Sequence, residues 1–219
     1  MSLPFTPIKI CGLSREADVD AAAELGAQAV GFVLYPDSPR AVSAVRAGEL
    51  ARRLPAFVDP VLLFVNADAD TVSRAVERVP GAWLQFHGDE SPEFCAQTAQ
   101  RLGARFIRAA RIPRDNPASF DLVKYAHEYS LAHALLLDTL VPGYGGGGQT
   151  FNWSQLPPSV NSHLVLSGGL TPANVADGLR ALHGRGLSLS VDVSSGVESA
   201  KGVKDRFKMQ AFIQAVRQA

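Results

Sequence analysis

The chain has 219 residues, and its 21 Lys and Arg balance 21 Asp and Glu, so the formal net charge of zero gives no basic surface for nucleic acid or anionic membranes. Hydrophobic residues make up 47% of the sequence and charged residues 19%, which excludes a disordered chain, and no apolar run approaches the ~18 residues of a membrane span. Two cysteines, Cys11 and Cys95, are too few for a disulfide framework, and the first residues lack a secretory signal, so we expect a soluble cytoplasmic protein.

Short apolar runs alternate with longer amphipathic stretches along the whole chain. Eight runs predict strands, several of them apolar throughout, as in parallel strands buried on both faces: Ile8–Cys11, Ala29–Leu34, Val61–Val65, Trp83–His87, Arg105–Ala109, Ala134–Asp138, His163–Ser167 and Leu189–Val193. Seven stretches with apolar residues three and four apart predict helices: Asp18–Leu25, Ala44–Leu54, Ala69–Val79, Pro92–Leu102, Pro117–Tyr129, Pro172–Leu182 and Val203–Arg217. The segment after Asp138 is the weakest helix and the richest in glycine.

This alternation predicts an α/β fold, a single-domain (β/α)8 TIM barrel over residues 1–219. A doubly wound open sheet is the structural alternative. That fold places its glycine-rich turn after the first strand, whereas the glycine clusters here follow the sixth, seventh and eighth strands. No linker or change of composition divides the chain, so we expect one domain.

Polar residues close four of the predicted strands. In a barrel of this kind the chemistry lies at the C-terminal ends of the strands, and alternate residues of a strand share a face. The pairs that share a face are Lys9 with Cys11, Gln85 with His87, and Asp192 with Ser194, while Asp138 ends the sixth strand. Each residue alone has an ordinary structural interpretation, namely a core cysteine, a hydrogen-bonded histidine or an Asx turn, so the argument rests on their joint occurrence. Cys95 lies in a helical pattern and is interpreted as a packing residue.

Two glycine- and serine-containing turns indicate a phosphate site. Gly168–Gly169 follow the seventh strand, before Thr171–Pro172, which we expect to open a helix, and Ser194–Ser195–Gly196 follow the eighth strand. The loops after these two strands form the recurring phosphate site of the barrel, where glycine lets the backbone approach an anion. Ordinary turn chemistry is the alternative for either turn taken alone.

A set of distinct short motifs is distributed along nearly the whole chain. In chain order they are Lys9–Leu13, Gly31–Val33 with Ser38–Arg40, Phe64–Asn66, Gln85–Glu90, Asp138 with Gly145–Trp153, Leu166–Asn174, and Val191–Glu198 with Lys204–Asp205. Together they resemble the phosphoribosylanthranilate isomerase family of the tryptophan pathway. The resemblance implies an Amadori rearrangement of N-(5-phosphoribosyl)anthranilate, without a redox cofactor or a metal.

The resemblance also implies roles for individual residues. It assigns the general base to Cys11 and the general acid to Asp138, and it places Lys9, Arg40, His87 and Asp192 among the substrate-binding residues, with Arg40 on the anthranilate carboxylate. Gly168, Gly169, Ser194, Ser195 and Gly196 are the expected phosphate ligands. We expect the small-molecule substrate as partner, and a monomer rather than a dimer.

Three physical hypotheses accompany these roles. A free thiol has a pKa of about 8.5, so Cys11 needs a cation such as Lys9 to favour its thiolate. Asp138 needs burial or a nearby carboxylate, such as Asp192, to keep its proton. The glycine-rich segment Thr139–Thr150 is expected to close over the substrate, the alternative being a long surface loop.

Two other functions stay open at this point. A histidine-pathway aminoaldose isomerase uses the same barrel but takes a bisphosphate, and Asn66–Ala67–Asp68 after the third strand lacks the second Gly-Gly turn that such a substrate calls for. A barrel that only binds a phosphorylated metabolite would need the phosphate loops without Cys11, Asp138 and Arg40.

Overall fold

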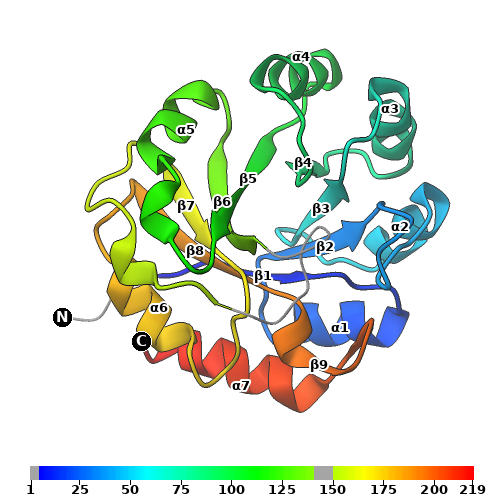
Figure 1. The fold of residues 1–219 in the computed structure, drawn as a ribbon. Coiled ribbons are helices and arrows are strands. Elements are labelled where there is room, and N and C mark those ends of the chain that lie inside the picture. The colour runs from blue at the N-terminus through cyan, green and yellow to red at the C-terminus, as the bar shows by residue number, and fades with distance from the viewer. Residues whose placement is uncertain (1–4, 141–149) are drawn as a thin grey trace.

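A computed structural model describes residues 5–140 and 150–219 and contains a closed barrel of eight parallel strands with helices outside it (Figure 1). The strands follow chain order around the barrel: β1 (Ile8–Cys11), β2 (Ala29–Val33), β3 (Asp59–Phe64), β4 (Trp83–Phe86), β5 (Phe106–Pro113), β6 (Ala134–Leu140), β7 (His163–Leu166) and β8 (Ser188–Val193). The barrel closes where β8 pairs with β1, with Lys9 in register with Asp192. The (β/α)8 barrel predicted from the sequence is confirmed.

Six α-helices of the described residues connect consecutive barrel strands, α7 follows β8 and the hairpin after it, and all run back along the outside of the barrel (Figure 1). They are α1 (Glu16–Glu24), α2 (Ala44–Ala51), α3 (Ala69–Arg78), α4 (Pro92–Leu102), α5 (Leu122–Glu128), α6 (Val175–Leu182) and α7 (Arg206–Arg217), with short 3-10 turns η1 (Pro117–Ser119), η2 (Trp153–Gln155) and η3 (Ser195–Val197). Side-chain caps explain several starts, since Ser43, Asp68, Ser91, Asp121 and Asp205 each accept a hydrogen bond from the backbone three residues on.

Three predicted helices begin later than expected. The Val203–Arg217 helix starts at Arg206, because Val203–Lys204 form strand β10, which pairs with β9 (Glu198–Ala200) in a hairpin that the sequence pattern did not indicate. The Pro117–Tyr129 helix divides into η1 and α5, with Asp121 as the cap between them. Thr171–Pro172 do not open α6, because a turn in which the Asn174 side chain accepts from the Thr171 N–H precedes the first helical residue.

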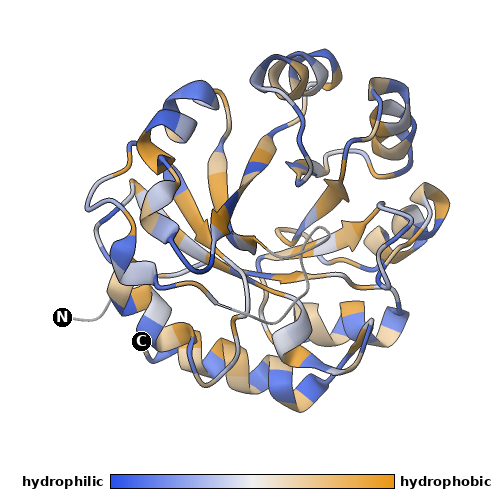
Figure 2. Ribbon diagram, viewed as in Figure 1, coloured by the Kyte–Doolittle hydropathy of each residue, from blue (hydrophilic) through white to orange (hydrophobic). Residues whose placement is uncertain are grey.

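The apolar side chains form two layers around the strands. Hydrophobic residues concentrate on the strands and on the helix faces turned toward them (Figure 2). Alternate residues point into the barrel, where a small separate cluster joins Ile107, Ala109, Ala134, Leu136 and Val165. This packed floor leaves the interior positions nearer the C-terminal strand ends to polar residues, which include Lys9, Gln85, Asp138 and Asp192, all buried. Within residues 5–140 and 150–219, no helix is long and apolar enough to cross a membrane.

Candidate active site

The sequence-predicted site residues lie at one end of the barrel, the end at which the strands finish. Cys11 is the last residue of β1, His87 follows β4, and Asp138 lies in the C-terminal half of β6. Since β7 and β8 separate β6 from β1 around the barrel, the two loops expected to bind phosphate come between the strands that carry Asp138 and Cys11.

Lys9 forms a buried ion pair next to Cys11. Its Nζ lies 2.8 Å from Oδ1 of Asp192, and both side chains are about 6% exposed. Oδ2 of the same carboxylate accepts a hydrogen bond from the Ser167 hydroxyl at 3.2 Å. The pair exists because β8 closes the barrel onto β1, which brings together two residues 183 positions apart. Burial alone would lower the pKa of Lys9, but Asp192 and Cys11 outweigh it and raise that pKa, so Lys9 remains an ammonium.

Gly31 of β2 provides the space that Cys11 occupies. Gly31 is in register with Cys11, and a Cβ built on it would lie 2.7 Å from Sγ of Cys11 and 3.1 Å from Nζ of Lys9. Real Cβ atoms do not come within 2.7 Å of another heavy atom, so any residue other than glycine here would displace the thiol and crowd the ammonium. The same geometry shows that Sγ of Cys11 and Nζ of Lys9 both lie against Gly31.

The pKa of Cys11 reflects opposing effects of burial and of neighbouring charges. Burial raises the pKa of the Cys11 thiol, Lys9 and Lys204 oppose this effect, and the Asp192 carboxylate adds to it, so the net shift is upward. Lys9 therefore favours the thiolate, as expected, without bringing the pKa below that of a free thiol. The reason is that Cys11 is 4% exposed and Lys9 shares its charge with Asp192.

Asp138 is held by His87. Oδ2 of Asp138 lies 2.9 Å from Nε2 of His87, and Oδ1 accepts a hydrogen bond from the Thr139 N–H. Nδ1 of His87 in turn lies 3.0 Å from the side-chain Nε2 of Gln85, an amide nitrogen that can only donate. With the Gln85 amide nitrogen as donor to Nδ1, a neutral imidazole carries its proton on Nε2, the nitrogen that faces Asp138. Gln85 and His87 share a face of β4, as the alternation predicted.

The backbone around His87 is anchored from outside the barrel. Arg108 of β5 donates from Nη1 to the Phe86 carbonyl and from Nη2 to the Gly88 carbonyl, the two carbonyls on either side of His87. The same guanidinium pairs with Glu90 at 3.0 Å, and both side chains are buried. The sequence analysis assigned no role to Arg108, because it lies inside a predicted strand and its contacts with the segment after β4 form only in the folded barrel.

Asp192 and Asp138, which the sequence hypothesis paired, each have polar partners of their own. The Asp192 carboxylate is occupied by Lys9 and Ser167, whereas the recorded side-chain partner of Asp138 is His87. The hypothesis that Asp192 helps Asp138 by repulsion stays a prediction, and Lys9, which pairs with Asp192, reduces the charge available for it.

The two loops expected to bind phosphate touch each other. Gly168 and Gly169, directly after β7, have φ values of 75° and 66°, a backbone region that favours glycine. A Cβ on Gly168 would lie 2.8 Å from Oδ1 of Asp138, so this loop also forms a wall of the Asp138 site. After β8, a Cβ on Gly196 would lie 1.8 Å from the Leu170 carbonyl oxygen. Only glycine at position 196 permits this close approach of the two loops. Ser194 and Ser195 lie directly before Gly196, at the start of η3.

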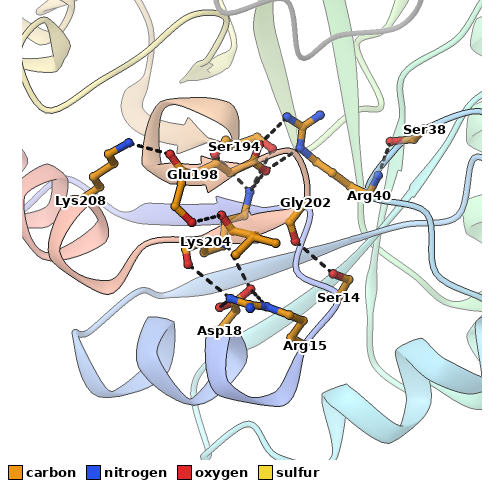
Figure 3. Close-up of polar contacts among 12 residues, drawn as sticks. Ser14, Arg15, Asp18, Ser38, Arg40, Ser194, Glu198, Gly202, Lys204 and Lys208 are labelled. Atoms are coloured by element: carbon orange, nitrogen blue, oxygen red, sulfur yellow. Dashed lines mark hydrogen bonds and ion pairs between the residues drawn. The ribbon is translucent and has the colours of Figure 1, made fainter.

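Arg40 lies in the loop after β2 and is part of a buried ionic cluster (Figure 3). Its Nε and Nη2 donate to the two carboxylate oxygens of Glu198 at 2.7 and 2.8 Å, and Lys204 Nζ lies 2.7 Å from the same carboxylate. Lys204 also donates to the carbonyl and the hydroxyl of Ser194. The sequence analysis quoted Glu198 and Lys204 only within a motif and gave them no role, since the contacts join segments 158 residues apart.

The segment proposed from the sequence to close over the site, Thr139–Thr150, lies largely outside the described residues, which exclude 141–149.

Comparison with known proteins agrees with this geometry. A family model described as N-(5'-phosphoribosyl)anthranilate (PRA) isomerase matches residues 8–215. The N-(5'-phosphoribosyl)anthranilate isomerase of Methylibium petroleiphilum is 54% identical over 214 residues, covering 98% of this chain and 95% of the relative. That of Leptothrix cholodnii is 53% identical and covers 98% and 92%.

Solved structures give the same result. The phosphoribosyl anthranilate isomerase from Thermotoga maritima aligns with a TM-score of 0.81 at 34% identity, covering 98% of this chain and all of that one. A phosphoribosyl anthranilate isomerase in complex with reduced 1-(o-carboxyphenylamino)-1-deoxyribulose 5-phosphate aligns with a TM-score of 0.78 at 31% identity, with the same coverage. The resemblance seen in the sequence is confirmed, and the chain belongs to the N-(5'-phosphoribosyl)anthranilate isomerase family.

Proposed function

We propose that Cys11 and Asp138 are the general base and general acid with which this chain isomerises N-(5'-phosphoribosyl)anthranilate. The reaction is an aldose–ketose isomerisation. Asp138 protonates the furanose ring oxygen, the ring opens to a Schiff base, and Cys11 removes the proton from C2 of the ribose. The resulting enolamine tautomerises to the 1-deoxyribulose product, so no electrons leave the substrate. One observation carries this assignment: two separate, buried proton-transfer groups lie at one end of the barrel. Each has its own partner, since Lys9 lies beside Cys11 and His87 contacts Asp138.

The partners of the two groups suit opposite roles. The Lys9 ammonium next to Cys11 stabilises a thiolate, and burial makes that thiolate a strong base once it has formed. His87 fixes one oxygen of Asp138 and Thr139 N–H contacts the other, so the carboxyl group has a defined orientation before substrate binds. In this arrangement Lys9, His87 and Asp192 tune and orient the reacting groups at the substrate site.

The order of the strands supports an orientation for the substrate. The loops after β7 and β8, with Gly168, Gly169, Ser194, Ser195 and Gly196, take the phosphate group between the strands that carry acid and base. Arg40 lies beyond β1, in the loop after β2, and takes the anthranilate carboxylate. The ribose then spans Asp138 and Cys11.

The test is a fluorescence assay with phosphoribosylanthranilate generated in situ, which follows loss of the anthranilate signal in the presence of EDTA. Cys11→Ala and Asp138→Asn are each expected to lower kcat about 10²- to 10⁴-fold, the usual contribution of a general acid or base. Cys95→Ala, a buried thiol of α4 remote from the barrel interior, serves as the matched control and is expected to retain kcat. Wild-type kcat in both site variants would show that the acid and base are assigned to the wrong residues.

The remaining expectations concern assembly and location. We propose that the chain works as a single domain in the cytoplasm, and as a monomer. A solved phosphoribosylanthranilate isomerase from Thermotoga maritima is described as dimeric, so light scattering at micromolar concentration is the direct test of the monomer.

A further inference from the structure

We infer that Glu198 is a positioning residue for substrate recognition: it fixes the guanidinium of Arg40 so that the free edge of this group receives the carboxylate of the ligand. The inference rests on the role proposed above for Arg40 and adds a residue that acts through it.

The geometry of the pair fixes the plane of the guanidinium. Nε and Nη2 of Arg40 donate to Oε1 and Oε2 of Glu198 at 2.7 and 2.8 Å. Because the contact has two points, the plane of the guanidinium cannot turn without breaking a hydrogen bond. Figure 3 shows this contact, with the second terminal nitrogen of Arg40 turned away from Glu198. A guanidinium has a second donor edge, formed by Nη1 and the other N–H of Nη2. That edge has the spacing to accept another carboxylate in the same bidentate manner.

The position of Glu198 is itself fixed by a hairpin. Glu198 opens β9 and is in register with Lys204 of β10, whose Nζ donates to Oε1 of Glu198 at 2.7 Å. Lys208 of α7 donates to the Glu198 carbonyl. Gly12 completes the arrangement, because a Cβ there would lie 2.4 Å from Cδ of Arg40 and 3.1 Å from Oγ of Ser194. The Arg40 side chain therefore lies against the backbone at the end of β1, next to Cys11.

With Lys204 protonated, the cluster has one positive charge in excess; burial lowers the pKa of Lys204, and the Glu198 carboxylate opposes that shift. Arg40 and Lys204 contribute two cations, and Glu198 supplies one carboxylate, all three side chains being at most 9% exposed. Burying an uncompensated charge is unfavourable, and a ligand carboxylate at the free edge of Arg40 would neutralise it. The arrangement thus favours an anion at Arg40, and Glu198 decides which edge of the guanidinium is available to it.

Lys204 links this cluster to the loop after β8. The same Nζ that contacts Glu198 donates to the Ser194 carbonyl at 3.1 Å, at the beginning of the loop expected to bind phosphate. A phosphate is therefore the second possible source of the compensating anion, and the experiment has to separate the carboxylate from the phosphate.

The experiment measures binding of two ligands that differ only in the carboxylate. One is reduced 1-(o-carboxyphenylamino)-1-deoxyribulose 5-phosphate, and the other is its phenylamino counterpart without the carboxylate. Isothermal titration of the wild type, Glu198→Gln and Arg40→Met is expected to show at least a tenfold loss of affinity for the first ligand in both variants, and less than about a twofold change for the second. In the Arg40→Met background, Glu198→Gln is expected to cause no further loss of carboxylate preference.

Two controls keep the result interpretable. Asp20→Asn removes the carboxylate from another two-point arginine pair, Asp20 with Arg53, on the outer surface, and should leave both affinities unchanged. Glu198→Asp keeps the charge but moves the carboxylate by one methylene, so it is expected to fold like the wild type and to lose an intermediate part of the carboxylate preference.

The outcomes separate the inference from the proposed function. Suppose that Arg40→Met weakens only the ligand with the carboxylate, while Glu198→Gln and Glu198→Asp weaken both ligands equally or neither. The inference is then overturned, and Glu198 has no role in recognition of the carboxylate. If Arg40→Met itself weakens both ligands equally, the proposed role of Arg40 fails, and the inference fails with it. Equal weakening of both ligands in Glu198→Gln overturns the inference whether its cause is structural or a contribution of Glu198 to the phosphate loop, because both ligands carry the phosphate and only one carries the carboxylate.

Discussion

The imidazole of His87, at the end of β4, lies 2.9 Å from the carboxylate of Asp138 in β6, although β5 separates the two strands. Gln85 contacts the other ring nitrogen, so three interior side chains form a chain of hydrogen bonds across the barrel. Networks of this kind keep a reacting group in one orientation, which makes His87 the principal determinant of where the Asp138 oxygens point.

His87→Asn is expected to lower kcat about 2- to 10-fold, because a hydrogen bond between neutral groups contributes about 0.5–1.5 kcal/mol. The shorter amide does not reach Asp138. His87→Gln, whose amide nitrogen extends close to the position of Nε2, should recover part of the loss. Steady-state kinetics at neutral pH measures both variants.

The control for this prediction is His133→Asn, which replaces an exposed histidine before β6, at the opposite end of the strands. It should keep wild-type kcat. An unchanged kcat in His87→Asn, with the same secondary structure by circular dichroism, would mean that Asp138 is oriented without His87.

Activity is expected to rise with pH through the neutral and mildly alkaline range. Burial raises the pKa of Cys11, so the thiolate fraction is small at neutral pH and increases as pH approaches that raised value. Lys9→Met removes the cation that lowers the pKa of Cys11, and it should move the rise in kcat/KM to higher pH. The pH profile of kcat/KM measures the shift, with Lys124→Met at the exposed surface of α5 as the control.

Lys9→Met should also lower the free energy of unfolding by about 3–5 kcal/mol, since it leaves Asp192 buried without its partner. The double variant Lys9→Met/Asp192→Asn removes the uncompensated charge and should recover much of that stability. A pH profile that does not move in folded Lys9→Met protein contradicts the role of Lys9.

Gly31→Ala is expected to lower kcat/KM about 10²-fold while the barrel still folds. The backbone of Gly31 is not in the left-handed region, so the effect comes from the added methyl group, which would lie 2.7 Å from Sγ of Cys11 and displace it. Gly184→Ala is the matched control: it has φ of 73° and open space around it, so it should cost about 1 kcal/mol of stability and leave kcat/KM unchanged. Equal kinetics of the two variants would show that the thiol tolerates the displacement.

Alkaline stability should depend on Cys95, whose buried thiol has its pKa raised from 9.0 to about 12 by desolvation. Because the thiol ionises near pH 9.0 in the unfolded chain, its contribution to stability is complete below that pH and is lost as pH rises toward about 12. At pH 10 the loss amounts to about 1.4 kcal/mol. Urea unfolding at pH 8 and pH 10 measures it, and Cys95→Ala should lose less stability than the wild type between these values. A parallel decline in both proteins would place the titrating group elsewhere.

The order and type of the elements could be read from the sequence with few errors. Apolar runs such as Val61–Val65 and the amphipathic stretches between them encode the strand and helix periods locally, and alternation placed Lys9 with Cys11 and Gln85 with His87 correctly on shared faces. The errors fell at helix starts, where the β9–β10 hairpin and the turn capped by Asn174 replaced expected helical residues, and at the end of β5, which continues to Pro113 instead of ending at Ala109. Such starts depend on pairing and capping partners, which a period does not reveal.

By itself, the sequence determined the barrel, the end of it that carries polar groups, and the residue types available there. Only the tertiary structure decided which groups pair: Lys9 with Asp192 across the closure of the barrel, His87 with Asp138 across β5, and Arg40 with Glu198 of the hairpin. It also decided the direction of the Cys11 pKa, which is raised because desolvation by the segments packed around the thiol outweighs the neighbouring Lys9. The period of apolar residues is a local property of the chain. The pairing of charges and the desolvation of a buried group depend on every segment that packs around the site, and those segments meet only after the chain has folded.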